Sequence, residues 1–179
     1  MRMKLKNVLF IVAGILLVVG LIIGRTTILN LMGGNVHFNE EYIGEVLTME
    51  DGQKFTVFRT LKIDGSGDYP DDLTVFKVRF RFKNLGTGTN KRLSIIPAPF
   101  LMGMKGFLEK YWTINESTNE FQGIYQWSNK DRAEQYPETF IFKVMTKRAA
   151  KGTVAYEIIP NTEISEYVST LREKQLITN

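Results

Sequence analysis

The stretch Gly106–Tyr136, GFLEKYWTINESTNEFQGIYQWSNKDRAEQY, decides the fold of this chain. Phe107–Ile114 and Glu120–Trp127 are rich in β-branched and aromatic residues and are separated by a short polar segment, which predicts a β-hairpin. Ser128-Asn129-Lys130-Asp131 is a variant of the capping box and starts a helix. The middle of the chain is therefore expected to run strand, tight turn, strand and capped helix.

The segment before this stretch supplies a further strand and a helix. In Leu73–Lys83 the side chains alternate between an apolar and a basic set: Phe76, Val78, Phe80 and Phe82, then Lys77, Arg79, Arg81 and Lys83. This pattern predicts a strand that buries the apolar set against helices and turns the basic set the other way. Asn90 is a candidate helix cap, and Leu93–Met104 is apolar nearly all round. This segment is predicted to be helical, and Pro97 and Pro99 are expected to break or kink the helix.

The segment after the hairpin completes the core. The helix that begins at Ser128 is expected to continue to Lys151 and to stop at Gly152, and Thr153–Ile159 reads as a final strand. The order β-α-β-β-α-β is that of an α+β, ferredoxin-like sandwich.

Two additions flank this core: a hairpin over Tyr42–Ile63 and an amphipathic helix over Thr162–Leu176. The expected organisation has five parts: a membrane anchor at 1–25, a connector at 26–41, a hairpin arm and loop at 42–72, the ferredoxin-like core at 73–160, and a C-terminal amphipathic helix and tail at 161–179.

An N-terminal transmembrane helix is predicted from the first residues. Arg2, Lys4 and Lys6 precede Val8–Gly24, a run of 17 residues without charge. About 17–25 apolar residues span a bilayer, and the basic flank favours a cytoplasmic N-terminus with an extracytoplasmic C-terminal domain. The alternative is a cleaved signal peptide, although residues 22–24 make a poor cleavage site.

The net charge of +4 comes from this membrane flank. Residues 1–25 hold four of the 23 Lys and Arg and none of the 19 Asp and Glu, so the rest of the chain has no net charge. A neutral body gives no electrostatic reason to expect nucleic-acid binding. Residues 26–72 carry three basic and nine acidic side chains, whereas residues 73–160 carry 14 basic and seven acidic ones. We expect the acidic arm to dock on the basic core, or both surfaces to be solvated independently.

Several chemistries are excluded by residues that the chain lacks. It contains no cysteine, which excludes thiol nucleophiles and cysteine-based metal sites. His37 is the one histidine and falls in the connector, so histidine-based metal sites are excluded as well. No metal is expected.

The central stretch is similar to a known family. The matching positions are Gly106, Phe107, Lys110, Trp112, Thr113, Gly123, Ile124, Tyr125, Ala133 and Tyr136. Over about residues 73–160 the chain resembles the YdhR-like putative mono-oxygenases of the dimeric α+β-barrel superfamily. The resemblance implies a ferredoxin-like fold with an apolar pocket between sheet and helices, in which the substrate itself activates oxygen. Haem-degrading relatives use a histidine on a core helix, and no matching position carries one, so no cofactor is expected.

The resemblance implies that aromatic, arginine and asparagine side chains orient a substrate. The substrate-binding candidates are Trp112, Tyr125, Trp127, Tyr136, Arg79, Arg81 and Asn84. The alternative for the aromatic residues is an ordinary core or a dimer interface. The alternative for Arg79 and Arg81 is a polar layer facing the hairpin or another subunit, with Glu109 and Glu157 as partners. No catalytic residue is identified.

We therefore expect a membrane-anchored protein that binds a lipophilic small molecule, in a cavity lined by Trp112, Tyr125 and residues of Leu93–Met104. A cofactor-independent oxygenase is the enzymatic form of this function, and the alternative is a non-catalytic, membrane-tethered binding or assembly module. A half-covered sheet favours a homodimer, unless the hairpin over Tyr42–Ile63 covers the same face within one chain.

Overall fold

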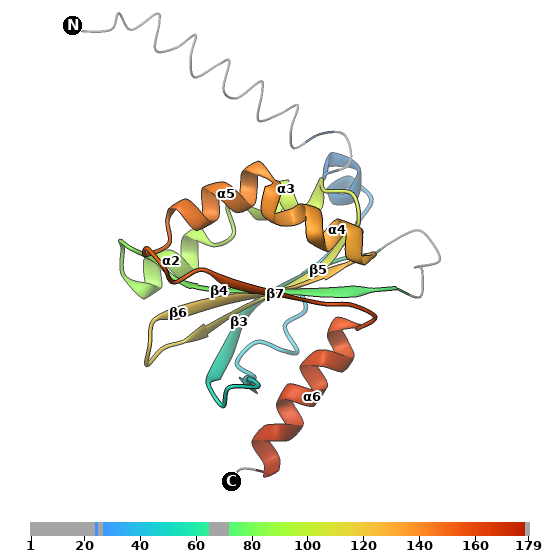
Figure 1. The fold of residues 1–179 in the computed structure, drawn as a ribbon. Helices are drawn as coiled ribbons and strands as arrows, with labels where there is room; N and C mark the ends of the chain where they lie inside the picture. Colours follow the sequence, from blue (N-terminus) through green and yellow to red (C-terminus); the bar gives the residue numbers. More distant parts are fainter. Residues whose placement is uncertain (1–23, 25–26, 65–71, 178–179) are drawn as a thin grey trace, which may run out of the picture.

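An antiparallel seven-stranded sheet forms the centre of the molecule (Figure 1). The structure is a computed structural model that describes residues 24, 27–64 and 72–177. The strands are β1 (Val36–His37), β2 (Val46–Thr48), β3 (Lys54–Ile63), β4 (Thr74–Arg81), β5 (Phe107–Asn115), β6 (Glu120–Trp127) and β7 (Ala155–Ile159). Their order across the sheet is β1-β3-β5-β6-β4-β7, and β2 pairs with β3 off this path.

The four strands β5-β6-β4-β7 and their crossovers make the ferredoxin-like core that the sequence predicts. The helical elements are α2 (Thr87–Leu93), α3 (Ala98–Met102), α4 (Lys130–Gln135), the 3₁₀ turn η1 (Tyr136–Glu138), α5 (Phe140–Lys147) and α6 (Ile164–Ile177). Figure 1 shows α2 to α5 on one face of the sheet and α6 on the other. The α+β ferredoxin-like fold is confirmed.

Strand β4 shows why the alternating sequence forms this sheet. Phe76, Val78 and Phe80 are buried in the core that also holds residues of α3 and α5. Lys77 and Arg79 lie on the opposite face, where they contact the turn after β2. The predicted division of the strand into an apolar and a basic face is confirmed.

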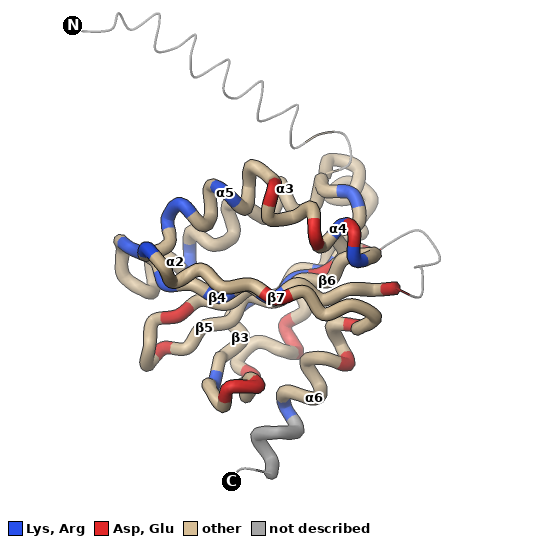
Figure 2. The backbone as a smooth tube through the Cα atoms, in the orientation of Figure 1, with Lys and Arg blue, Asp and Glu red and all other residues tan. Residues whose placement is uncertain are grey.

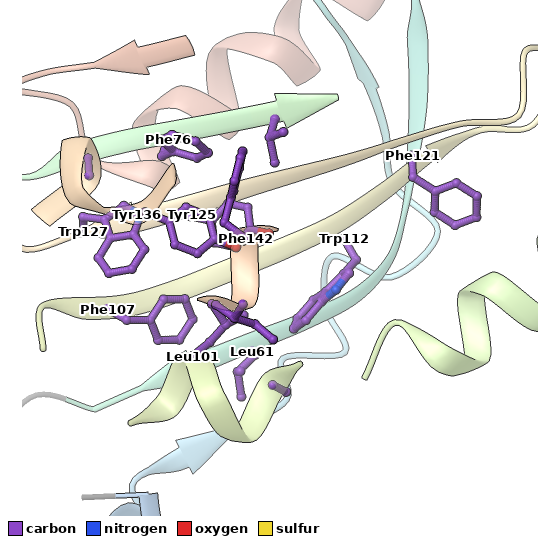
Figure 3. Close-up of a cluster of buried hydrophobic side chains, with 14 of the residues drawn as sticks. Leu61, Phe76, Leu101, Phe107, Trp112, Phe121, Tyr125, Trp127, Tyr136 and Phe142 are labelled. Carbon is purple, nitrogen blue, oxygen red and sulfur yellow. Dashed lines mark hydrogen bonds between the residues drawn. The ribbon is translucent and has the colours of Figure 1, made fainter. Parts of the chain in front are cut away.

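Two hydrophobic cores lie on the two faces of the sheet. The first joins the sheet to α3, α4 and α5 and contains a dense aromatic group around Phe76, Tyr125 and Tyr136 (Figure 3). The second joins the other face to β2 and to the apolar side of α6, including Val168 and Leu171. The exposed sheet face was the physical reason to expect a homodimer, and β2 and α6 cover part of it within one chain. The homodimer stays a prediction.

The predicted hairpin arm over Tyr42–Ile63 is integrated into the sheet. Within the predicted hairpin, three residues of β2 pair with β3, whereas β3 pairs with β5 from Thr56 to Lys62. Strand β3 buries apolar side chains on both faces of the sheet, with Phe55 on one side and Leu61 on the other. A strand that buries both faces belongs inside a sheet, so this segment is not a separate arm.

Two helix predictions were wrong in detail. The helix expected from Ser128 to Lys151 is divided into α4, η1 and α5, because Pro137 lacks the amide proton that a continuous helix needs and the Thr139 side chain caps α5 instead. Asn90 is no cap; it lies inside α2, buried, and its amide donates to the carbonyl oxygens of Asn84 and Leu85. The predicted break at Pro97 is present, since α2 ends at Leu93 and α3 begins at Ala98.

Within the described residues, no helix is long and apolar enough to span a membrane. The predicted anchor at 1–25 lies, apart from Gly24, outside the described residues.

Candidate functional site

An apolar cavity of about 180 Å³ lies between the sheet and the helices. Its sheet side is formed by β4, β5 and β6, with Trp112, Gly123 and Tyr125 at its centre. Its helix side includes Pro97 and Phe100, because the break between α2 and α3 prevents a single helix from covering the sheet. The cavity predicted between Trp112, Tyr125 and the segment Leu93–Met104 is therefore present.

The rim of the cavity is apolar and open to solvent. Ile96, Phe140 and Val144 line the cavity and are 59%, 67% and 40% exposed. Apolar side chains exposed around an apolar cavity are typical of a site that admits an apolar ligand. No Asp or Glu lines the cavity within the described part of the chain.

Lys110 is the one lysine among the residues that line this cavity, and it is buried. It lies on the same face of β5 as Trp112, and its Nζ is 4.2 Å from the centre of the Trp112 ring and 4.3 Å from that of Tyr125. These two cation–π contacts are the electrostatic interactions that stabilise the amine, since its side chain makes no hydrogen bond or ion pair with any described residue. Two aromatic faces replace only part of the water that a charged amine loses on burial.

Burial therefore lowers the pKa of Lys110 well below its usual range, and the nearby Arg59 guanidinium lowers it further. Arg59 lies on β3, the next strand of the sheet, and its Nη1 donates to the Ser94 hydroxyl at 2.6 Å. Burial also lowers the pKa of Arg59. The site thus holds an amine with reduced charge beside a guanidinium that donates to neutral groups, the Ser94 hydroxyl and the Lys91 carbonyl oxygen.

Two buried tyrosines continue the site toward the helices. The Tyr136 hydroxyl donates to the Tyr125 hydroxyl at 3.2 Å, and the Tyr125 hydroxyl donates to Met145 Sδ at 3.8 Å. Burial raises the pKa of both phenols. These hydroxyls are neutral hydrogen-bonding groups at neutral pH and can orient a polar atom of a ligand.

Gly123 allows the Tyr125 ring to lie flat along β6. A Cβ atom at Gly123 would lie 2.6 Å from Tyr125 Cε2 and 3.0 Å from its hydroxyl oxygen. Such distances are shorter than van der Waals contact, so only glycine at this position leaves the ring where it is. The shape of the cavity therefore depends on a residue that contributes no side chain.

The seven predicted site residues occupy different places. Trp112 and Tyr125 line the cavity, and Tyr136 contacts it through the Tyr125 hydroxyl. Trp127 is buried in the same core, packs against Tyr136, and does not line the cavity; its indole Nε1 has no hydrogen-bond partner in the described structure. Asn84 is exposed in the loop before α2.

The remaining two candidates, Arg79 and Arg81, lie away from the cavity. Arg79 Nη1 contacts Asp51 at 2.6 Å, and its Nε donates to Gln122 at 3.1 Å. Arg81 is exposed at the end of β4. The expected partners Glu109 and Glu157 do not pair with either arginine in the described structure, so the alternative of a polar layer facing the hairpin describes Arg79 better.

This polar layer connects the acidic turn after β2 to strand β4. Lys77 contacts Glu50 and Glu157, each at 2.9 Å, and the Tyr167 hydroxyl donates to Glu50 at 2.6 Å. Burial opposes the charge on both partners, but these hydrogen bonds outweigh it, raising the pKa of Lys77 and lowering that of Glu50 to about 2. The prediction that the acidic arm docks on the basic core is confirmed. A hollow of about 310 Å³ lies over this layer, but its cations are already paired.

Sequence reasoning missed Lys110 and Gly123 as site residues, although both belong to the matching positions. A signal was present for Lys110, because period-two alternation places it in register with Trp112 and Ile114 on the buried face of β5. No group of three His, Cys, Asp or Glu side chains within 27–64 and 72–177 is placed to hold a metal ion. His37 lies on β1 and contacts Asp64 at 2.7 Å, away from the cavity.

Comparison with known proteins gives a family. Residues 75–169 match the family model described as "Putative mono-oxygenase ydhR". No curated protein matches the chain.

Three solved structures illustrate the fold similarity. A putative monooxygenase from Fusobacterium nucleatum is 13% identical with a TM-score of 0.44, over 60% of this chain and 49% of that one. The haem-degrading enzyme of Listeria monocytogenes is 14% identical with a TM-score of 0.45, over 69% and 95%. A Listeria monocytogenes ferredoxin-fold protein related to antibiotic biosynthesis monooxygenases is 18% identical with a TM-score of 0.46, over 78% and 90%. The chain spans about half the length of the Fusobacterium protein.

Proposed function

The chain belongs to the ydhR mono-oxygenase family, and from this membership we propose that it binds a lipophilic small molecule in the cavity at Trp112 and Tyr125. The observation that carries the proposal is the apolar cavity of about 180 Å³ with its exposed apolar rim. A dry, engineered cavity of about 150 Å³ lined by apolar side chains binds benzene. A ligand portion the size of one aromatic ring therefore fits here.

The enzymatic form of the proposal is oxygenation without a bound cofactor. An oxygenase of this kind needs an apolar pocket, neutral hydrogen-bonding groups that orient the substrate, and a positive field where negative charge develops. The phenols of Tyr125 and Tyr136 and the cationic side chain of Arg59 supply these groups. Oxygen uptake by the purified chain with aromatic hydroquinones tests this form, and the absence of uptake with hydroquinones that bind leaves a binding function alone.

The binding proposal has a direct optical test. Nitrobenzene is a small apolar quencher of indole fluorescence, and we expect it to quench the full chain saturably and to raise the melting temperature with concentration. Trp112→Phe should remove most of the saturable quenching, whereas the matched Trp127→Phe should keep it, because only Trp112 lines the cavity.

A variant that obstructs the cavity completes the test. Val144→Trp places a large side chain at the rim and should abolish the shift in melting temperature, whereas Lys143→Trp on the neighbouring exposed position of α5 should not. Equal responses of the two variants, or linear quenching without saturation, would contradict the binding proposal.

We further propose that residues 8–24 anchor the chain in a membrane as a single span, with the C-terminal domain extracytoplasmic. The uncharged run of 17 residues after three basic side chains supports this proposal. Deleting residues 1–25 should release a folded, soluble protein from membranes. Mature protein that begins near Arg25 would instead establish a cleaved signal peptide.

A further inference from the structure

Lys110 differs from Lys77, a half-buried lysine of the sheet, in having no countercharge. Lys77 contacts two carboxylates and a tyrosine hydroxyl. Lys110 is 2% exposed, lines an apolar cavity, and makes cation–π contacts with the rings of Trp112 and Tyr125. Within the described residues, no ion pair explains why a lysine is buried at this position.

The charged and titratable groups around Lys110 favour a neutral amine. Arg59 approaches from β3, Arg148 lines the cavity from the end of α5, and the Tyr125 phenol lies beside it on β6. Two of these three groups are cationic, and none is a carboxylate. Burial and the Arg59 charge together lower the pKa of Lys110 well below its usual range.

A neutral amine is a nucleophile, whereas an ammonium group is not. An ordinary lysine, with a pKa of about 10.4, is neutral in only about one molecule in 2,500 at pH 7. A lysine desolvated in a hydrophobic pocket, or placed next to another cation, is activated for attack on carbonyl groups. Lys110 combines both conditions, since it is buried and lies close to Arg59.

We propose that Lys110 captures apolar aldehydes and ketones that enter the cavity, by forming an imine between its Nζ and the carbonyl carbon. The nitrogen lone pair attacks the carbonyl carbon to give a carbinolamine. The carbonyl oxygen then leaves as water with the two hydrogens of the amine, and the C=N bond forms. The step requires no oxidant, reductant or metal, and hydrolysis reverses it.

The cavity restricts the class of carbonyl compound. Its lining is largely apolar and its volume of about 180 Å³ corresponds to one ring or a short chain. Benzaldehyde meets both conditions, whereas a sugar aldehyde would leave hydroxyl groups buried without partners. The inference rests on the proposed function to the extent that the cavity must admit an apolar molecule.

Reductive trapping tests the inference on the full chain in detergent. The protein is incubated with benzaldehyde and sodium cyanoborohydride at pH 7, and peptide mass spectrometry locates the benzyl groups among its 14 lysines. We expect Lys110 to be labelled at least about tenfold faster than any other lysine whose side chain the structure describes, because among these it alone combines burial without a countercharge and access to the cavity. The pH dependence of its labelling should differ from that of the exposed lysines, because burial and the Arg59 charge lower the pKa of Lys110.

Two variants and a competitor separate reactivity from structure. Lys110→Met should remove the fast site, and the exposed Lys105→Met should keep it. Toluene, which has the size of the probe but no carbonyl group, should slow the labelling of Lys110 and not that of exposed lysines. This competition is measured on the unmodified chain, so it stands even where Lys110→Met fails to fold.

The outcomes distinguish this inference from the proposed function. Saturable nitrobenzene quenching without preferential labelling of Lys110 overturns the inference and leaves the binding function in place. Labelling of Lys110 that follows the same pH dependence as labelling of the exposed lysines also overturns it, because the amine would then be an ordinary one. Absence of both quenching and preferential labelling refutes the binding function as well.

Discussion

Replacing Gly123 by alanine should destabilise the protein although alanine normally stabilises a strand. Where its backbone conformation is compatible, Gly→Ala stabilises by about 0.4–1 kcal/mol through the unfolded chain. Gly123 has no positive φ, so this gain applies. Against it stands the Cβ atom, which would lie 2.6 Å from Cε2 and 3.1 Å from Cζ of the Tyr125 ring.

The Tyr125 ring cannot move away without disturbing its neighbours. It is fully buried and packs edge-on against Phe76 with ring centres 5.9 Å apart, while its hydroxyl bonds to Tyr136. Overpacking of this kind costs about 1–3 kcal/mol. Subtracting the gain of about 0.4–1 kcal/mol leaves a net loss of roughly 0.5–2 kcal/mol in the free energy of unfolding. Tyr125 lines the cavity, so a displaced ring should also weaken nitrobenzene binding.

A double-mutant cycle in urea measures this conflict directly. The Gly123→Ala change is made in the natural chain and in Tyr125→Leu, where the aromatic ring is absent. We expect alanine to destabilise the first and to be neutral or stabilising in the second, with a coupling of about 1–3 kcal/mol. If alanine at position 123 stabilises the natural chain, the ring does not lie where the packing argument requires.

Three further outcomes are expected. Phe80→Ala should lower the free energy of unfolding in urea by about 3–5 kcal/mol, because Phe80 is buried between β4 and the helices; a near-neutral effect would mean that this strand faces the other way. Glu50 has its pKa held at about 2 against an ordinary 4.5 despite burial, through hydrogen bonds from Tyr167 and Lys77, so its stabilising effect is complete above about pH 4.5 and disappears as the pH falls toward 2. Glu50→Gln should flatten that part of the stability profile, and an unchanged profile would contradict the pairing. Added haem should give no stoichiometric Soret band, and saturable one-to-one binding abolished by a tyrosine substitution would overturn this expectation.

Local patterns in the sequence predict much of the core. Alternation over Leu73–Lys83 gives the faces of β4, and the paired aromatic runs give β5 and β6, because side-chain direction in a strand follows directly from position. The break before Pro97 follows from proline chemistry, and with it the cavity. These inferences need only neighbours in the chain.

Features that depend on distant segments could not be read in the same way. Strand β3 has the composition of a strand, but its pairing of Thr56 with Ile114 joins residues far apart in the sequence. The sequence therefore predicts a hairpin outside the core, because local patterns do not reveal that β3 pairs with β5. The sequence does not identify Lys110 as a site residue, because a single charged residue in a strand says little about which segments cover its face.

The charge distribution explains why Lys77 has carboxylate partners and Lys110 has none. The acidic arm supplies Glu50 and Asp51 to the face of the sheet that carries Lys77 and Arg79, as Figure 2 shows for the acidic residues below the sheet. Alternation sends Lys110 to the opposite face, which the arm does not reach and which the helices cover with apolar side chains. The same residue type is therefore a structural ion-pair partner on one face and a reactive amine on the other. A carboxylate introduced beside Lys110 should restore its charge and suppress its labelling by benzaldehyde, which makes the missing countercharge the physical origin of the site.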